Sequence, residues 1–129
     1  MSTESVERGV EVLRQTTVAL VRRDGPDLSA RQLGVFLTCY LEGEAQTVRG
    51  LAARLNVSKP AITRALDRLS EFDLVRRKTD PLDRRSVLVQ RTMAGAAFLR
   101  DLKRILADAG KEAESMPSKA RRATALVGA

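Results

Sequence analysis

Few side chains of the kinds used in catalysis occur in this sequence of 129 residues, which contains no His and a single Cys, Cys39. His is the commonest general base and a very common zinc ligand, so its absence argues against both kinds of site. The sequence also has no Gly-rich phosphate loop, and no Ser or Cys beside a plausible base. We therefore expect a protein that is not an enzyme and that binds neither a metal nor a cofactor.

Basic side chains are abundant, and their excess lies in one part of the chain. The sequence has 23 Lys and Arg against 16 Asp and Glu, which gives a formal charge of +7. Residues 45–100 hold twelve of the basic and five of the acidic residues, and the rest of the chain is balanced. A localised excess predicts a polyanionic partner such as nucleic acid. The alternative is an Arg-rich surface that is only solvated.

The residues between 48 and 69 follow the layout of a helix-turn-helix. Ala52 is small enough for two helices to cross closely, and Asn56, four residues later, tolerates the left-handed conformation that ends a helix. Val57 supplies an apolar residue for the turn, and Ser58 can cap the second helix. The pattern predicts a first helix from Arg49 to Asn56 after a short extended piece at residues 47–48. The alternative is an ordinary helical hairpin.

The second helix is expected over residues 58–72, with the missing N–H of Pro60 tolerated in its first turn. The predicted buried side of this helix consists of Ile62, Ala65, Leu66 and Leu69. Helical spacing then turns four residues outward: Pro60, Arg64, Asp67 and Glu71. Three residues lie on the flanks: Ala61, Thr63 and Arg68. The acidic residues are absent from its first half, which is the half that a recognition helix presents to base edges. Arg can read guanine there, and Thr can contact a base edge or a methyl group.

Two extended segments, Leu74 to Thr79 and Ser86 to Arg91, surround the charged loop Asp80 to Arg85 and predict a β-hairpin. Arg77 lies on the first segment, and Arg84 and Arg85 lie near the loop tip. A narrow minor groove attracts arginine through its negative potential. We expect one Asp of the loop to hold it by pairing with Arg85, which leaves Arg84 free. The alternative is a surface loop whose charges pair only with one another, at about 0–1 kcal/mol each.

Helices are predicted on both sides of this region. A first helix over about 5–23 ends at Gly25-Pro26 and carries a coiled-coil-like seam. A second begins after Ser29, ends near Gly43 and includes Cys39, which we expect to be buried and inert. Thr92 caps a last long helix, Pro117 ends it, and residues 118–126 form a short further helix. The predicted apolar residues are Val6, Val10, Leu13, Thr17 and Leu20 in the first, Leu33, Phe36, Leu37, Tyr40 and Leu41 in the second, and Phe98, Leu102, Ile105, Leu106 and Ala109 in the last.

The chain resembles the MarR family of bacterial winged helix-turn-helix regulators. The resemblance rests on LAARLNVSKPAITRALDRL (51–69) and LVRRKTDPLDRRSVLVQRTMAGAAFL (74–99), of which the strand–DPLDRRS–strand–T-x-x-G run is the more specific. It implies a mainly α fold with a small β-hairpin wing, in one domain over 1–129. Two copies would pair through helices at 5–24 and 93–127, and residues 29–92 would form the DNA-binding part. The wing arginine of the family falls on Arg84 or Arg85.

The expected function is that of a homodimeric, sequence-specific regulator of transcription, a repressor, on a pseudo-palindromic operator in double-stranded DNA. The recognition helix 58–72 would enter the major groove and the wing 80–86 the minor groove. The candidate DNA-binding residues are Ser58, Lys59, Pro60, Thr63, Arg64, Arg68, Arg77, Arg84 and Arg85. The alternatives are a winged-helix module that binds protein and a non-specific architectural DNA binder.

The remaining expectations concern location and effector. One Cys and a polar first segment favour the cytoplasm, and no apolar run reaches the ~20 residues of a membrane span. The resemblance also implies an aromatic or phenolic effector between the dimerisation and DNA-binding parts, but the sequence assigns no residue to such a site.

Overall fold

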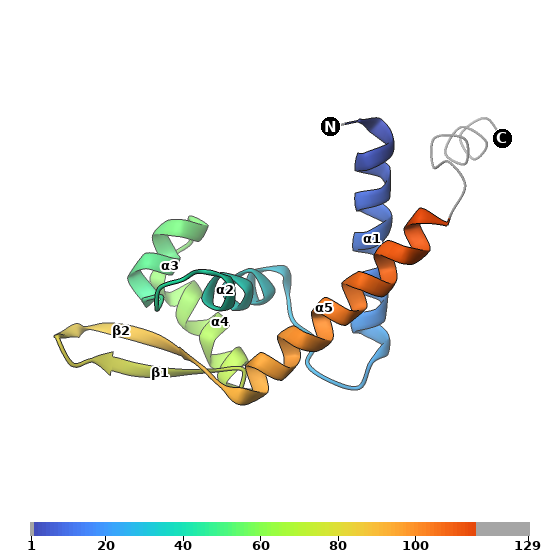
Figure 1. Ribbon diagram of the computed structural model, residues 1–129. Helices are drawn as coiled ribbons and strands as arrows, with labels where there is room; N and C mark the ends of the chain where they lie inside the picture. The colour runs from blue at the N-terminus through green and yellow to red at the C-terminus, as the bar shows by residue number, and fades with distance from the viewer. Residues whose placement is uncertain (1, 116–129) are drawn as a thin grey trace. The chain divides into compact units, whose positions relative to one another are not determined.

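The computed structural model describes residues 2–115 and consists of helices with one β-hairpin (Figure 1). Its contacts divide the chain into two compact units, residues 26–100 and the segments 1–25 with 101–129, which we describe separately. The elements in chain order are α1 (Thr3–Arg22), α2 (Ala30–Leu41), α3 (Val48–Leu55), α4 (Lys59–Glu71), β1 (Val75–Asp80), β2 (Asp83–Arg91) and α5 (Met93–Glu114). The predicted fold class, mainly α with a small β-hairpin in a winged helix-turn-helix, is confirmed.

Short polar side chains fix where the helices of residues 26–100 begin. Ser29 forms a capping box with Gln32 at α2, and the Ser58 hydroxyl accepts the Ala61 N–H at α4, both as their positions predict. Thr47 does the same at α3, where its hydroxyl accepts the Gly50 N–H. Because of this cap, α3 begins at Val48. Residues 47–48 were expected to be extended, and this expectation is wrong for Val48.

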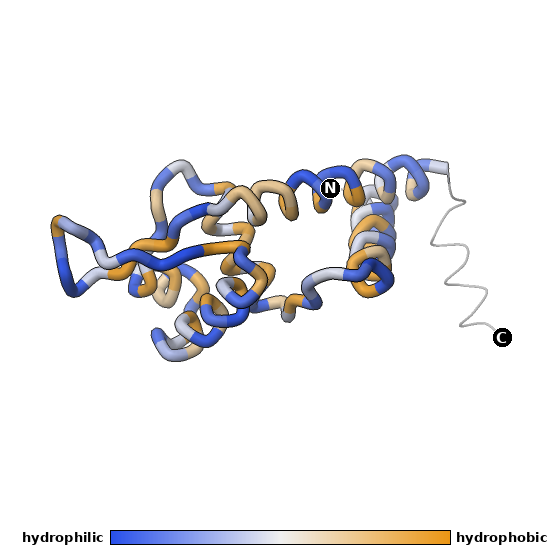
Figure 2. The backbone as a smooth tube through the Cα atoms, turned by 90° about the horizontal axis from the view of Figure 1, so that it is seen from below, coloured by the Kyte–Doolittle hydropathy of each residue, from blue (hydrophilic) through white to orange (hydrophobic). Residues whose placement is uncertain are grey.

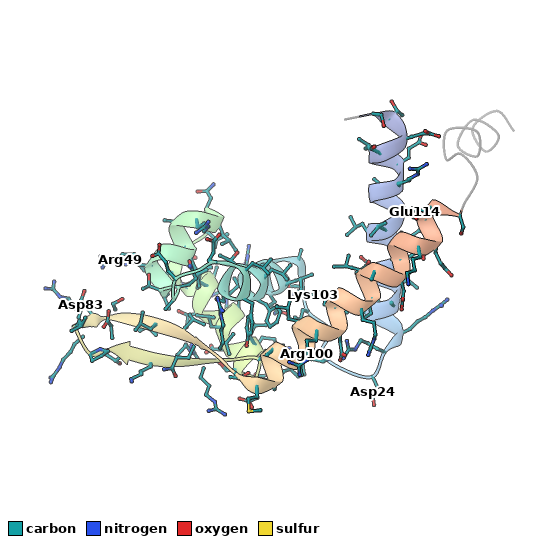
Figure 3. All side chains as sticks on the ribbon, viewed as in Figure 1. Asp24, Arg49, Asp83, Arg100, Lys103 and Glu114 are labelled. Carbon is teal, nitrogen blue, oxygen red and sulfur yellow. The ribbon has the colours of Figure 1, made fainter. Side chains whose placement is uncertain are left out.

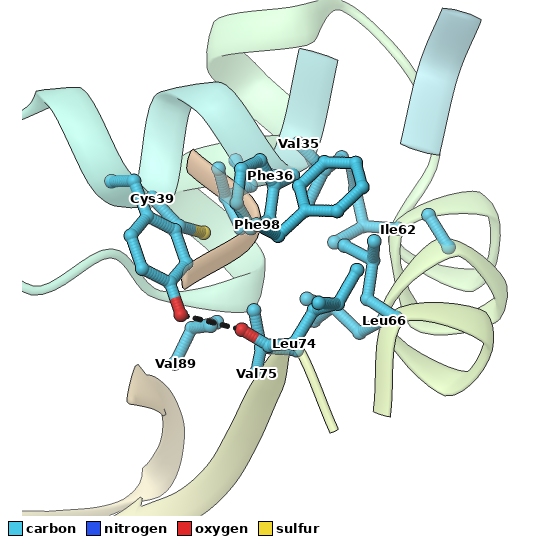
Figure 4. Packing of buried hydrophobic residues seen from close by; sticks show 14 residues of the cluster. Val35, Phe36, Cys39, Ile62, Leu66, Leu74, Val75, Val89 and Phe98 are labelled. Carbon is cyan, nitrogen blue, oxygen red and sulfur yellow. Dashed lines mark hydrogen bonds between the residues drawn. The ribbon is translucent and has the colours of Figure 1, made fainter. Parts of the chain in front are cut away.

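The core of this unit lies between α2, α4, the hairpin and the first turns of α5 (Figure 4). Phe36 is stacked on Tyr40, with ring centroids 4.4 Å apart, and meets Phe98 edge to face at 5.1 Å. The buried residues of α4 include all four that were predicted: Ile62, Ala65, Leu66 and Leu69.

Two predicted side-chain positions in this core are wrong. Leu41 is exposed and Val35 is buried instead, because α2 packs against both α4 and β2 and its buried face is turned toward Val35 and Cys39. Ala61 was placed on a flank of its helix but is buried. It adjoins Ile62 at the edge of the buried face of α4 and is 6% exposed. The burial of Cys39 is confirmed.

The hairpin is longer and its turn is shorter than the sequence predicted. The two strands pair antiparallel from Val75 opposite Arg91 to Asp80 opposite Asp83, with a register shift after Thr79. Only Pro81 and Leu82 lie between the strands, so Asp80 of the predicted loop belongs to β1 and residues 83–85 belong to β2. The Asp80 carboxylate accepts the Leu82 N–H at 2.9 Å, which closes this tight turn.

The other edge of β2 is tied to the segment before α3. Thr47 and Leu88 form a β-bridge, and the Val89 N–H donates to the Gln46 carbonyl oxygen at 2.9 Å. The hairpin is therefore joined directly to the start of α3. This connection fixes the wing relative to the helix-turn-helix.

A polar cluster, buried at the Tyr40 hydroxyl, joins α2, the hairpin and α5. The Tyr40 hydroxyl donates to the Leu74 carbonyl oxygen at 2.6 Å and accepts the Thr92 N–H at 2.9 Å. The Thr92 hydroxyl accepts the Gly95 N–H, which confirms the predicted cap of α5. Arg91 donates to the carbonyl oxygens of Cys39 and Glu42, and so satisfies acceptors at the end of α2.

In the unit formed by 1–25 and 101–129, α1 begins at Thr3 and ends at Arg22, just before the predicted breaker pair. Three residues of its predicted seam, Val6, Val10 and Leu13, are 48%, 61% and 65% exposed. On α5, Leu102 and Ala109 are buried as predicted, whereas Leu106 is exposed. Arg23 and Asp101 form an ion pair at 3.3 Å. The predicted break at Pro117 and the helix over 118–126 fall outside the described residues.

Candidate nucleic-acid interface

The turn between α3 and α4 has the backbone conformation that its sequence predicts. Asn56 adopts φ 56° and ψ 47°, the left-handed region. The Val57 N–H donates to the Ala52 carbonyl oxygen at 3.1 Å, so the chain reverses within three residues and Ser58 begins the next helix. The two helices of the motif are thus joined by a short turn, whose conformation is fixed by Asn56 and by the Val57–Ala52 hydrogen bond.

The first half of α4 exposes Lys59, Pro60, Thr63 and Arg64. Within residues 2–115, neither Lys59 nor Arg64 has a carboxylate within ion-pairing distance. The Ser58 hydroxyl accepts a backbone N–H as the helix cap, but its own hydrogen stays available for a phosphate oxygen. Five of the nine candidate residues therefore lie at the exposed N-terminal end of one helix.

Two other candidates are bound to carboxylates. Arg68 pairs with Glu71 at 2.8 Å and lies over the Phe72 ring at 4.6 Å from its centroid. Arg77 of β1 reaches across to Asp67 of α4 at 2.6 Å. This second ion pair links the second helix of the motif to the wing. The sequence alone did not predict either pair.

The last two candidates, Arg84 and Arg85, are exposed on β2 next to the hairpin turn. Figure 2 shows mostly hydrophilic residues beside this turn and a hydrophobic stretch at its tip. The Asp83 carboxylate accepts the backbone N–H of Arg85 at 3.1 Å. The expectation that an Asp holds this loop is confirmed, but it acts through a main-chain N–H and not through the Arg85 guanidinium. Among the described residues, both guanidinium groups are without an ion-pair partner.

A cleft of about 720 Å³ lies between the beginnings of α3 and α4 and the wing, and we call it the wing cleft. Figure 3 shows Arg49 and Asp83, which come from its two sides. It is lined by Thr47, Val48, Arg49, Lys59, Thr63, Arg77, Asp83, Arg85, Ser86 and Val87. Four of the candidate residues meet here. Arg49, the second residue of α3, was missed, because only the placement of α3 beside the wing brings it to this cleft.

Other kinds of site receive no support from the part of the chain that is described. No group of three metal-ligating side chains occurs within residues 2–115, and no helix there is long and apolar enough to cross a membrane. Burial raises the pKa of the Cys39 thiol from its ordinary value of 9.0 to about 11, although the charge of Arg91 lowers it in part. That thiol is protonated near neutral pH and is a poor nucleophile.

Comparison with known proteins shows which family this chain resembles. Residues 26–86 match the model of the MarR family. An HTH-type transcriptional regulator of Mycobacterium tuberculosis is 32% identical over 93 residues, which are 72% of this chain and 64% of that protein. The chain thus matches somewhat less than two thirds of the length of its curated relatives.

Solved structures agree with the fold. A MarR-family transcriptional regulator from Rhodococcus sp. RHA1 is 28% identical, with 95% of this chain and 84% of that chain covered at a TM-score of 0.63. A MepR mutant of S. aureus bound to an oligodeoxyribonucleotide has a TM-score of 0.72 over 99% of this chain and 93% of its own, at 17% identity. By sequence match and fold together, the chain is similar to the MarR family of winged helix-turn-helix transcriptional regulators.

Proposed function

We propose that this chain forms a homodimer that regulates transcription by binding a specific sequence in double-stranded DNA. The observation that carries the proposal is the exposed cationic end of α4, with Lys59 and Arg64, beside a wing that exposes Arg84 and Arg85. The MepR mutant with the same fold, bound to an oligodeoxyribonucleotide, supports it. Members of the MarR family are transcriptional regulators and not enzymes.

The major-groove contacts are assigned to the first two turns of α4. Arg64 can donate two hydrogen bonds to the O6 and N7 atoms of guanine, and Thr63 can contact a neighbouring base. Pro60 is small and exposed and leaves room for a close approach, while Ser58 and Lys59 can hold a phosphate. Arg68 and Arg77 are engaged with carboxylates, so we assign them first to shaping the surface and only secondarily to DNA.

Dimerisation is assigned to α1 together with the C-terminal helix. Val6, Val10 and Leu13 expose an apolar row that a second copy would cover. A dimer of two-fold symmetry binds a pseudo-palindrome whose half-sites are about one helical turn apart. Bound over a promoter, it would exclude the polymerase, which makes a cytoplasmic repressor the simplest form of the proposal. An aromatic or phenolic effector stays a prediction without assigned residues.

Selection of duplexes from a random pool by the purified full chain tests the proposal. We expect a pseudo-palindrome and an affinity that falls steeply with salt, with a log–log slope of about −0.9 for each phosphate contacted. Recovery of bound duplexes without sequence preference would indicate an architectural DNA binder. Failure to bind any duplex at moderate salt would favour a module that binds protein.

A further inference from the structure

The tip of the hairpin is apolar, although charged residues surround it. Only Pro81 and Leu82 lie between the two strands, and Leu82 is 95% exposed. Figure 1 shows this turn at the end of the hairpin that lies away from α2, α3 and α4. Neither residue lines the wing cleft. Single exposed leucines are common on protein surfaces, so the position of Leu82 matters more than its exposure.

The backbone of this turn is fixed by local interactions. The Asp80 carboxylate accepts the Leu82 N–H at 2.9 Å, and the Asp83 carboxylate accepts the Arg85 N–H at 3.1 Å. The ring of Pro81 restricts its own φ angle. The Leu82 side chain is therefore presented from a rigid turn, and a partner that covers it needs to order little further backbone.

The charges beside the tip cancel. They comprise two acidic residues, Asp80 and Asp83, and two basic residues, Arg84 and Arg85. Each carboxylate accepts a main-chain N–H, whereas neither guanidinium group has an ion-pair partner among the residues that the structure describes. Because these four formal charges sum to zero, the turn attracts a polyanion less than the cationic start of α4 does. The turn can therefore gain affinity chiefly through its apolar surface.

The minor groove of DNA accepts apolar side chains. Leu, Ile, Met and Pro residues of proteins that bind this groove are frequently inserted between base steps, which they partly unstack. Full burial of a leucine side chain strengthens binding by about ten- to a hundredfold, and separating a stacked step costs at least as much. A single leucine can therefore enter only where a step separates easily. Pyrimidine–purine steps have this property.

We propose that Leu82 is a specificity-determining residue, whose side chain enters the minor groove as an apolar wedge at a pyrimidine–purine step. The neighbouring Arg84 and Arg85 hold the wing at the groove, and Leu82 selects the step. This inference rests on the proposed function, because the tip reaches a base step only when the wing lies in the minor groove. It gives a role to an exposed side chain to which the sequence alone assigned none.

The first experiment measures the affinity of L82A for the selected duplex and for duplexes in which each pyrimidine–purine step is replaced in turn. We expect L82A to bind the selected duplex about tenfold more weakly. Its log–log salt slope should be unchanged, since no phosphate contact is lost. One replacement in each half-site should weaken the wild type but not L82A. Because Leu82 is exposed, L82A removes no packing within the protein and should fold normally.

Two further variants serve as controls. L82M should retain most of the affinity and of the step preference, because methionine is apolar and of similar volume. M93A is the matched control, since Met93 is 90% exposed and begins α5, beyond the opposite end of β2. It loses an apolar side chain of comparable size and exposure and should bind every duplex as the wild type does.

The second experiment detects unstacking directly. The adenine of the sensitive step is replaced by 2-aminopurine, whose fluorescence rises when its stacking is lost. At saturating protein, the wild type and L82M should raise this fluorescence, and L82A should not. Saturation ensures that the difference does not reflect the weaker binding of L82A.

The outcomes separate this inference from the proposed function. The wedge is overturned, while DNA binding stands, if L82A binds as tightly as the wild type or if M93A loses as much affinity. It is also overturned if L82A weakens all duplexes equally, or if the wild type leaves the fluorescence unchanged at every step. If the wild type selects no duplex at all, the proposed function fails and this inference fails with it.

Discussion

Gly95 lies in the first turn of α5, at a point where no side chain fits. A Cβ atom at this position would lie 1.7 Å from the Tyr40 hydroxyl oxygen and 2.4 Å from the Leu74 carbonyl oxygen. These two atoms also hydrogen-bond to each other. The glycine of the T-x-x-G run is therefore explained by close packing, and the threonine by its role as helix cap.

We expect G95A to lower the free energy of unfolding by about 1–3 kcal/mol. The added methyl group would displace the hydrogen-bonded Tyr40 hydroxyl and Leu74 carbonyl groups. Denaturant titration of the two proteins measures the change. G34A is the matched control, because Gly34 is in the middle of α2 and its added Cβ would meet only Leu55, at an ordinary 3.8 Å. That variant should gain about 0.5–1 kcal/mol. Equal stability of G95A and wild type would refute this packing argument.

Cys39 illustrates how burial controls a reactive group. The raised pKa, about 11, means that the folded protein keeps the thiol proton to higher pH than the unfolded chain, whose thiol titrates near 9.0. The contribution to stability is fully present below pH 9 and is lost as the pH rises toward 11. The difference in unfolding free energy between wild type and C39A should accordingly shrink over this range. A pH-independent difference would contradict the assignment, as would rapid alkylation of the folded protein near pH 7.

Arg64 is the residue to which base reading is assigned in the proposed function. R64A should cost about 1–3 kcal/mol in binding to the selected duplex and should relax the preference at one base pair of each half-site. Competition binding against single-base variants of the duplex measures both effects. R31A removes the same charge from the exposed start of α2, outside α3, α4 and the wing, and should leave the preference unchanged. A uniform loss across all variants would show that Arg64 contacts phosphate instead of a base.

At the scale of elements, the helix ends were predictable and the contacts between elements were not. Ser29, Ser58 and Thr92 cap helices by accepting the backbone N–H of the third residue after them. Such local hydrogen bonds can be predicted from the sequence. The ion pair between Asp67 and Arg77 depends on how far β1 lies from α4, which no local pattern encodes.

In the candidate site, too, the local features were predictable from the sequence and the contacts between elements were not. The exposed end of α4 came from helical periodicity, because that spacing is set by the helix itself. The wing cleft needs the β-bridge between Thr47 and Leu88, which brings the start of α3 to the hairpin. Arg49 therefore could not be assigned to the site until the elements were placed around it.

The Asp67–Arg77 pair gives a prediction at this scale. Both side chains are partly exposed, 54% and 31%, so D67N should change the unfolding free energy by less than about 1 kcal/mol. The same variant releases Arg77 into the wing cleft and removes a carboxylate near the DNA. We expect tighter duplex binding and a log–log salt slope that steepens by up to about 0.9. An unchanged slope would indicate that Arg77 stays out of reach of the phosphates.

At the scale of the whole molecule, the excess charge and the apolar row of α1 lie in different parts of the chain, although Leu82 and Met93 are also exposed within residues 45–100. The excess of positive charge falls within residues 45–100, whereas the exposed apolar row lies on α1. This division suits a protein in which one part meets a polyanion and another meets a copy of itself. Like charges near a dimer interface would oppose association.

The assignment of dimerisation to α1 is tested by placing a charge in its apolar row. L13E puts a carboxylate where a second copy would pack, and burying an unpaired charge is costly. Sedimentation should show a shift from dimer to monomer, and affinity should fall far more for a duplex with two half-sites than for one with a single half-site. R8E is the control, because Arg8 points about 200° away from Val6 around the helix, given 100° per residue, and the charge change is larger. If L13E stays dimeric, or if R8E dissociates equally, α1 does not form the interface through this row.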